Sequence, residues 1–141
     1  MNKTILTDSC FWLGLIDATD QHHGRSELIA GLIAPYQIIV PWPILYETMS
    51  TYLARRRSQL ILLEELIRRP NVLLFDDKDY KDEALHEVLT LNRQAGYTYS
   101  LADCVIREIL RDVNLRLHYF VTFNQKDFVD ICVSRRIEII D

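Results

Sequence analysis

Acidic and amide side chains follow the strand-like runs of this sequence, where parallel sheets usually build their functional sites. Asp8 and Asn124 directly follow two such runs, and Glu47 follows a third by one helical turn that begins with proline. Asp103 lies near the start of a helical pattern. If the strands are parallel, these side chains meet beyond the carboxyl ends of the strands. Carboxylates placed together repel one another, so we expect a hard divalent cation such as Mg²⁺, which takes oxygen ligands, to bind among them.

Five short apolar runs are expected to form strands, and the longer patterns between them are expected to form helices. The expected strands cover residues 4–7, 37–41, 72–75, 119–123 and 137–140. The expected helices include residues 26–34, 43–55, 58–69, 79–95 and 101–112. Helical patterns between successive strands indicate βαβ units with right-handed crossovers. We therefore predict a three-layer α/β/α sandwich around a five-stranded, mainly parallel sheet.

Length and composition indicate one intracellular domain. Of the 141 residues, 49% are hydrophobic, which suffices for one substantial core, so we assign residues 1–141 to a single domain. The formal net charge of −4 argues against a protein that holds nucleic acid simply by being basic. Cys10, Cys104 and Cys132 lack paired spacing, which indicates free thiols. With no signal-peptide pattern and no apolar run of membrane-spanning length, we expect a soluble cytoplasmic protein without membrane contacts.

Each acid also has an ordinary structural explanation. Asp8 is a favoured N-cap for a helix that begins at Ser9. Ser100–Asp103 has the spacing of a capping box, and Asn124–Asp127 repeats that spacing. Glu47 is explained equally well as a first-turn acid that the helix dipole favours. Four unrelated acids or amides at one edge of one sheet are nevertheless less expected than a site, so we favour the functional interpretation.

The helical pattern over 101–112 predicts which of its charged residues are accessible. Its apolar stripe consists of Leu101, Val105, Ile109 and Val113. Asp103, Arg107 and Arg111 fall outside this stripe, so we expect them to face away from it. Asp103 is therefore expected to be accessible.

The order of the candidate residues along the chain resembles that of a known nuclease family. The residues that carry the likeness are Thr7-Asp8-Ser9, Glu47, Ser100-Leu101-Ala102-Asp103 and Thr122-Phe123-Asn124-Gln125-Lys126-Asp127-Phe128. This order resembles the PIN-domain ribonucleases, and most closely the toxin halves of VapBC-type toxin–antitoxin pairs. The resemblance spans essentially the whole chain. It implies the strand order 3-2-1-4-5 and an endoribonuclease activity that depends on Mg²⁺ or Mn²⁺.

The resemblance also implies site residues and partners. The invariant acids of the family fall on Asp8, Glu47 and Asp103, which are the implied metal ligands. The family's fourth position, commonly aspartate, falls here on Asn124, and Asp127 lies one residue further away than in the common form. Asn124, Asp127 or a water therefore completes the outer shell. The implied partners are an RNA substrate, cut to leave a 5′-phosphate and a 3′-hydroxyl, a cognate antitoxin protein and a second copy in a homodimer.

These residue types suit metal-assisted hydrolysis of a phosphodiester. Asp8 and Asp103 would bind the ion most directly, and Glu47 is either a further ligand or the base that orients the attacking water. The ion polarises a phosphoryl oxygen and lowers the pKa of its water. Thr122 and Asn124 either hydrogen-bond the scissile phosphate or fix a carboxylate.

Arginines are concentrated in one part of this acidic chain. Residues 54–69 contain Arg55, Arg56, Arg57, Arg68 and Arg69 against Glu64 and Glu65. Arg55 and Arg56 are candidates to contact an RNA backbone. A solvated helix face or a dock for an acidic partner explains the same charges equally well.

Aromatic and histidine side chains suggest two further binding roles. Tyr46 and Tyr52 lie near the acid of the second helix, where an exposed ring would stack a base, whereas Trp42 is expected to pack in the core. His22 and His23 suggest a soft-metal site, although no third ligand lies at a recognisable spacing.

Two alternative functions remain open from the sequence. A catalytically weak or inactive PIN-like module that binds RNA or a protein is the first, because Asn124 weakens the acidic group. A receiver-like signalling domain is the second, since Asp76 and Asp77 follow the third strand. The receiver interpretation gives no role to Glu47 or Asp103.

Overall fold

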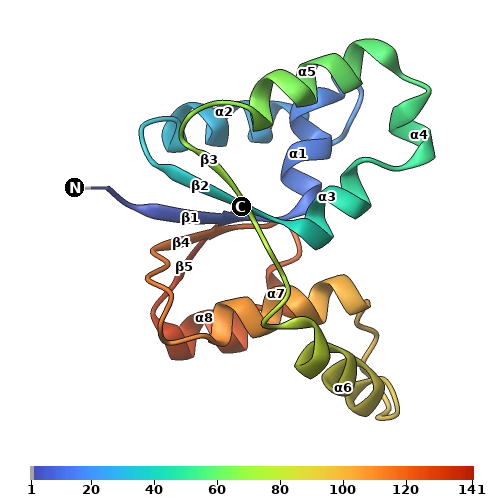
Figure 1. Ribbon diagram of the computed structural model, residues 1–141, viewed down its shortest axis with the longest axis vertical. Coiled ribbons are helices and arrows are strands. Elements are labelled where there is room, and N and C mark those ends of the chain that lie inside the picture. Colours follow the sequence, from blue (N-terminus) through green and yellow to red (C-terminus); the bar gives the residue numbers. More distant parts are fainter. Residues whose placement is uncertain (1) are drawn as a thin grey trace.

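Five parallel strands form the central sheet of the protein (Figure 1). The computed structural model describes residues 2–141, and its strands are β1 (Thr4–Thr7), β2 (Gln37–Pro41), β3 (Val72–Phe75), β4 (Tyr119–Val121) and β5 (Glu138–Ile140). They pair in the order β3-β2-β1-β4-β5, and every pairing is parallel. The predicted fold class and the predicted strand order are both confirmed.

Helices cover both faces of this sheet (Figure 1). On one side lie α1 (Ser9–Ile16), α2 (His23–Ile33), α3 (Trp42–Thr48), α4 (Thr51–Ala54) and α5 (Arg57–Ile67). On the other lie α6 (Lys81–Leu91), α7 (Leu101–Arg111) and α8 (Val129–Arg135), with the 3₁₀ turn η1 (Gln125–Asp127) between β4 and α8. The central strands need this cover because Ile5, Leu6, Phe120 and Val121 have no exposed surface. Within residues 2–141, no helix has the length and apolar character of a membrane span.

The predicted helix 43–55 is wrong, because the structure divides this segment into α3 and α4. The first ends at Thr48, and Ser50 takes the extended backbone of an N-cap for the second. Serine favours caps over helix interiors, since its hydroxyl competes for backbone hydrogen bonds. The break separates Glu47 from the arginines that follow α4.

Other predicted boundaries differ by a few residues. The predicted helix 79–95 ends at Leu91, where the Asn92 amide exchanges hydrogen bonds of 2.7 and 2.8 Å with the Tyr99 backbone. The fourth strand ends at Val121, two residues earlier than predicted, and the helix predicted to start after Asn124 is instead the turn η1 followed by α8. The shorter α6 leaves residues 92–100 as a connecting loop beside α7.

The buried face of α7 is broader than the predicted apolar stripe. Leu101 and Val113 are exposed, whereas Cys104, Ile106 and Leu110 are buried. Arg107 was predicted to face away from the stripe, but it is only 5% exposed. The prediction is wrong because partners from two other helices supply the hydrogen bonds that a buried guanidinium requires.

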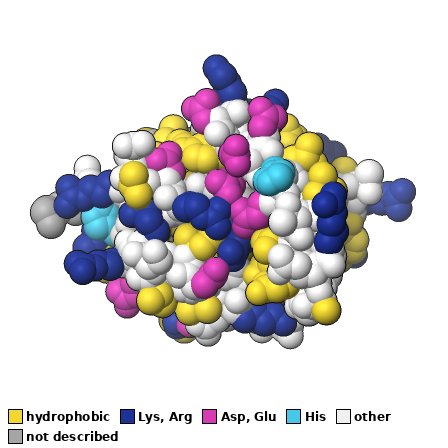
Figure 2. All heavy atoms as spheres, turned by 90° about the horizontal axis from the view of Figure 1, so that it is seen from below, with side chains coloured by type: hydrophobic (Ala, Val, Ile, Leu, Met, Phe, Trp, Pro, Cys, Tyr) yellow, Lys and Arg dark blue, Asp and Glu magenta, His cyan; other side chains and the backbone are white. Residues whose placement is uncertain are grey.

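Arg107 connects α6, α7 and α8 through a network of ion pairs. Its guanidinium donates to Glu87 of α6 at 2.8 Å and to both carboxylate oxygens of Asp130 in α8, at 3.0 and 3.1 Å. It also donates to the backbone carbonyl of Asp127, at 2.6 Å. Arg111 joins Glu87 to Glu108. Figure 2 shows acidic and basic side chains intermixed at the centre of the face that these helices form.

We expect Arg107→Met to lower the free energy of unfolding by about 3–5 kcal/mol, because it removes the buried cation that binds Glu87, Asp130 and the Asp127 carbonyl together. Arg111→Met is the matched control, since Arg111 is 47% exposed and its ion pairs are screened by water. Its expected cost is at most about 1 kcal/mol. Urea unfolding of the two variants gives both values, and equal losses would contradict the anchoring role of Arg107.

Candidate active site

The fold brings three of the predicted site acids to the carboxyl edge of the sheet. These are Asp8, Glu47 and Asp103, which we call the acidic group. Asp8 directly follows β1, and Glu47 lies in α3, which follows β2. Asp103 lies in the first turn of α7, the helix that precedes β4 and therefore begins at the same edge. Helices α3 and α7 approach each other there, from opposite sides of the sheet (Figure 1).

Asp8 is a buried N-cap with both carboxylate oxygens hydrogen-bonded. One oxygen accepts from the Ser9 backbone N–H and the other from the Thr122 hydroxyl, each at 2.8 Å. The predicted cap is thus confirmed, and Thr122 fixes the carboxylate from β4. Burial raises the pKa of Asp8, and the charge of Asp103 raises it further against the two hydrogen bonds. Asp8 is therefore a rigidly held carboxyl group whose charged form is disfavoured by burial and by Asp103.

Asp103 takes part in the predicted capping box. Its backbone N–H donates to the Ser100 hydroxyl at 3.0 Å, and its carboxylate accepts from the Ser100 backbone N–H at 3.1 Å. These two bonds fix the side chain in the first turn of α7. The carboxylate is partly exposed and lies near enough to Asp8 and Glu47 for its charge to raise their pKa values. Asp103 therefore both caps α7 and belongs to the acidic group.

The helix dipole does not stabilise the charge of Glu47. It lies in the last turn of α3, so its predicted place in the first turn is wrong, and a negative charge there is unfavourable. Partial loss of water raises the pKa of Glu47 to about 7, and repulsion from Asp8 and Asp103 adds to the shift. The residue as a whole is exposed, so this desolvation reflects crowding around the carboxylate, which also lies near Ser9.

The segment after β4 supplies the remaining predicted site residues. Thr122 is fully buried, and its hydroxyl accepts from the Asn124 backbone N–H at 3.0 Å while it donates to Asp8. Asn124 is exposed, and its predicted capping bond is absent from the described part of the chain. Burial and the nearby charge of Asp103 raise the pKa of Asp127. Asn124 and Asp127 thus both border the acidic group.

The acids of the group lack basic partners. None of Asp8, Glu47 and Asp103 forms an ion pair with any residue from 2 to 141. Across the same residues, no three acidic, histidine or cysteine side chains converge tightly enough to hold a metal ion by themselves. Mg²⁺ is often bound by only one or two carboxylates, keeps several waters and shares a phosphate. The oxygen donors present therefore suit such an ion, with water and substrate as further ligands.

The predicted substrate-contacting side chains are more dispersed. Arg55 and Arg56 are exposed after α4, and the Arg56 guanidinium lies 3.8 Å from the centre of the Tyr52 ring. Trp42 was predicted to pack in the core but is 40% exposed, beside the exposed Tyr46. The prediction is wrong because Trp42 opens α3 at the sheet edge, where only part of its ring finds neighbours.

The two histidines are engaged in packing and hydrogen bonding. His22 stacks on Phe123 at a centroid distance of 4.2 Å. His23 contacts the Gly14 carbonyl through one ring nitrogen and Glu27 through the other, at 2.8 and 2.6 Å. Neither ring nitrogen of His23 is left for a soft metal.

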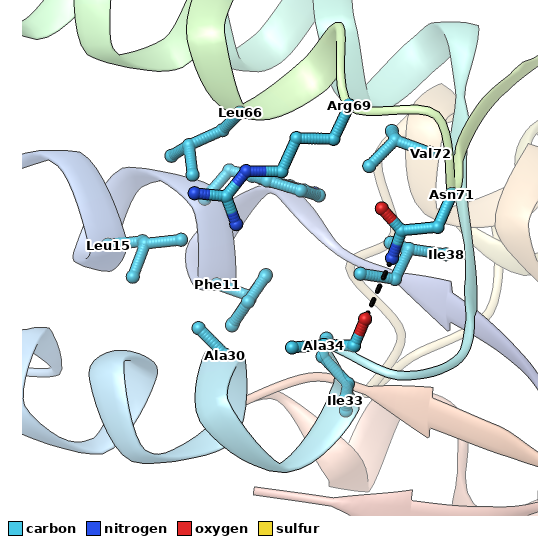
Figure 3. A pocket seen from close by; sticks show the side chains of 11 residues that line it. Phe11, Leu15, Ala30, Ile33, Ala34, Ile38, Leu66, Arg69, Asn71 and Val72 are labelled. Carbon is cyan, nitrogen blue, oxygen red and sulfur yellow. Dashed lines mark hydrogen bonds between the residues drawn. The ribbon is translucent and has the colours of Figure 1, made fainter.

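A small cavity lies at the opposite edge of the sheet (Figure 3). Its walls include residues just before β2 and β3, so it opens at the amino ends of the strands. Arg69 extends between Leu15 and Leu66, and Asn71 donates to the Ala34 carbonyl at 3.1 Å. The cavity has a volume of about 110 Å³, and no acid lines it. It is therefore separate from the acidic group.

Comparison with solved structures relates this architecture to known proteins. No protein-family model matches the sequence, and no curated protein is similar enough to indicate a relationship. VapC20 from Mycobacterium tuberculosis, a toxin that cleaves the sarcin-ricin loop, gives a TM-score of 0.69 at 20% identity, over 89% of this chain and 94% of its own. VapBC2 from Rickettsia felis, solved with a promoter DNA fragment, gives a TM-score of 0.63 at 17% identity over 97% of both chains. FitAcB from Neisseria gonorrhoeae gives a TM-score of 0.59 at 12% identity, over 97% of this chain and 96% of its own.

The chain has a PIN-like fold. This result excludes the receiver-like alternative, whose strand order 2-1-3-4-5 places the third strand inside the sheet. In this protein β3 is an edge strand, so Asp76 and Asp77 follow the edge rather than the centre. The PIN-like order instead gives β1, and with it Asp8, the central place.

One part of the site region was not predicted from the sequence. Residues 96–99 form a pocket with Lys126 and Asp127, next to the acidic group. The available signal was the Tyr-Thr-Tyr sequence that immediately precedes Ser100 and its capping box.

The raised pKa of Glu47 predicts a pH-dependent stability in the presence of chelator. A carboxyl group whose pKa is about 7 when folded and 4.5 when unfolded binds more protons in the folded state between those values. Its contribution to stability is therefore present at low pH and is lost as the pH rises through about 7. We expect the melting temperature in chelator to rise as the pH falls from about 7 to about 4.5, and Glu47→Gln to reduce this rise.

Comparison of the wild type with Glu47→Gln separates the contribution of Glu47 to the pH dependence from those of other groups. Glu108 also has a pKa raised to about 7, by burial and by Glu87, but it is present in both proteins. Parallel melting curves across this pH range would contradict the repulsion assigned to Glu47.

Proposed function

We propose that the protein is an endoribonuclease that hydrolyses RNA phosphodiester bonds with the help of Mg²⁺ or Mn²⁺. The observation that carries the proposal is the group of Asp8, Glu47 and Asp103, three mutually repelling acids that form no ion pair with residues 2–141. Uncompensated carboxylates lower stability, so their presence at a sheet edge is best explained by a cation that binds them. The PIN-like fold shared with the RNA-cleaving VapC20 supports this choice of reaction.

We further propose that the protein is the toxin of a toxin–antitoxin pair. The likeness to the VapC20 toxin and to the VapBC2 structure supports an antitoxin protein as a partner. A homodimer and a cytoplasmic location accompany this proposal. Arg55 and Arg56 are assigned to the RNA backbone, because they are exposed cations without an acidic partner in the ion pairs of residues 2–141.

Asp8 and Asp103 would hold the metal ion, with Glu47 as a further ligand or as the base. When bound, the ion supplies a Lewis acid for a phosphoryl oxygen and lowers the pKa of its water. Thr122 and Ser9 hold the Asp8 carboxylate in one orientation, and the capping box does the same for Asp103. These contacts reduce the reorganisation that binding and reaction require.

The remaining residues act on water and on the phosphate. With a pKa of about 7, Glu47 is suited to accept a proton from the attacking water near neutral pH. Asn124 is exposed at the border of the acidic group, so its amide is assigned to a phosphate oxygen. Asp127 either completes the outer shell or orients water, since it lies within charge range of Asp103.

A module that binds RNA or protein without cleavage is the second candidate. It is favoured by Asn124, which stands where an acid is common, and by the lack of a three-ligand group in residues 2–141. Both candidates are compatible with RNA binding, and only the nuclease predicts cleavage that needs a metal.

Asp103→Asn is expected to lower metal-dependent cleavage of RNA at least about a hundredfold, which corresponds to about 2.7 kcal/mol of transition-state stabilisation. Asparagine keeps an oxygen that can accept from the Ser100 backbone N–H, so the fold should persist. Gel assays with purified RNA and circular dichroism measure the two effects. Asp103→Ala, which loses that acceptor, is the control for capping. Nearly full cleavage by a folded Asp103→Asn variant would rule out the proposed role of Asp103.

Metal binding gives a second test that does not depend on turnover. An ion that binds only the folded state stabilises it by about 2.7 kcal/mol at a hundredfold excess over the dissociation constant. We expect Mn²⁺ to raise the melting temperature of the wild type and to have much less effect on Asp103→Asn. The same melts in chelator should show the variant at least as stable as the wild type, because one repelling charge is gone. A wild type insensitive to Mn²⁺ and a destabilised variant would identify Asp103 as a cap alone.

A further inference from the structure

Two tyrosines form an ordered stack beside the acidic group. The rings of Tyr97 and Tyr99 lie 5.9 Å apart with an interplanar angle of 26°. The Arg107 guanidinium lies 5.0 Å from the centre of the Tyr99 ring. Arg107, Tyr99 and Tyr97 therefore form a ladder that begins at a buried cation and ends at an exposed ring, because Tyr97 is 45% exposed.

The base of this ladder is fixed by contacts from three elements. The Asn92 side chain binds the backbone N–H and carbonyl of Tyr99, at 2.8 and 2.7 Å. Ser100, the next residue, caps α7. Arg107 is held by its ion pairs with α6 and α8. A ring that is already ordered loses little conformational freedom on binding a flat partner.

The ladder forms one wall of a pocket next to the candidate active site. Besides Tyr97 and Tyr99, the pocket is lined by Gly96, Thr98, Lys126 and Asp127, and its volume is about 380 Å³. Asp127 lies within charge range of Asp103, which places the pocket beside the acidic group. Lys126 supplies a cation at the rim, where it is exposed to solvent.

We propose that Tyr97 and Tyr99 form a stacking platform for one base of single-stranded RNA, next to the bond that is cut. Lys126 would contact the phosphate of that nucleotide. The proposal rests on the proposed function, since it assigns a subsite to its substrate. A polar pocket that combines a ring face with one cation suits a nucleotide, because every base has a face that stacks on an aromatic ring.

The other exposed aromatic side chains near the site are less suited to this role. The Tyr52 ring carries the Arg56 guanidinium on it, at 3.8 Å. Trp42 and Tyr46 lie 6.1 Å apart and are tilted by 44°, so they present no common face.

The platform is tested with the full chain carrying Asp103→Asn, which binds RNA without cutting it under the proposed function. Fluorescence anisotropy with a labelled single-stranded RNA of random sequence should show about tenfold weaker binding after Tyr97→Leu. Tyr97→Phe is the matched control, since it keeps the ring, and should bind like the parent. Double-stranded RNA, whose bases are already stacked, should bind Tyr97→Leu and the parent equally.

An abasic scan gives a second measurement, made on the Asp103→Asn parent and repeated on its Tyr97→Leu variant. One abasic nucleotide moved along a single-stranded RNA should weaken binding most at one position, and Tyr97→Leu should abolish that difference. In the otherwise wild-type protein, Tyr97→Leu should raise KM about tenfold and leave kcat within about twofold. Equal RNA affinity of Tyr97→Leu and its parent, or an abasic scan without a preferred position, would overturn the platform.

The experiment separates this inference from the proposed function. Loss of single-stranded binding in Tyr97→Leu, combined with no cleavage by the wild type, would support the platform while the nuclease proposal fails. Cleavage by the wild type with unchanged KM in Tyr97→Leu would do the reverse. If Tyr97→Leu weakens only the complex with the antitoxin, the stack is a protein contact and the inference is wrong.

Discussion

Parallel pairing of β1 with its two neighbours is the constraint on which the rest of the structure depends. Because β2, β1 and β4 run in one direction, the residues that follow them, Glu47, Asp8 and Thr122, emerge at the same edge. The central strands are buried on both faces, so the connecting helices must lie on both sides of the sheet. The crossover through α7 begins at this edge and adds Asp103 to the group. The acids therefore meet as a consequence of strand direction, although they are far apart in sequence.

The pKa values of two glutamates in this protein are shifted in opposite directions. Burial alone would raise the pKa of Glu87, but hydrogen bonds from Glu108, Arg111 and Arg107 outweigh it and lower the value to about 2. Glu47 forms no ion pair with any residue from 2 to 141 and has only Ser9 as a hydrogen-bond partner, so desolvation and repulsion raise its pKa to about 7. Charge is thus balanced where three helices must be joined and left unbalanced at the sheet edge. Separation of pKa values by environment is typical of sites that carry out acid–base chemistry.

Capping and metal binding are compatible roles for the same carboxylates. Asp8 starts α1 and is also tied to the end of β4 through Thr122. Asp103 starts α7 through its exchange of hydrogen bonds with Ser100. Each cap fixes the rotamer of its acid, and a carboxylate oxygen with a spare lone pair can still accept a further ligand. Helix starts at the carboxyl edge therefore supply both the rigidity and the charge that a site requires.

The sequence by itself determined what depends on neighbouring residues. Apolar runs predicted the five strands, and local spacing predicted the Asp8 cap and the Ser100–Asp103 box, because the interacting groups lie within three residues of one another. The strand order followed only from the family resemblance. Tertiary structure alone decided the burial of Arg107, whose partners Glu87 and Asp130 lie 20 and 23 residues away. It also decided the exposure of Trp42 and the stack of Tyr97 on Tyr99 over Arg107. The physical reason is that burial and ion pairing depend on which distant segments pack together, and the pattern of one segment carries no information on its neighbours in space.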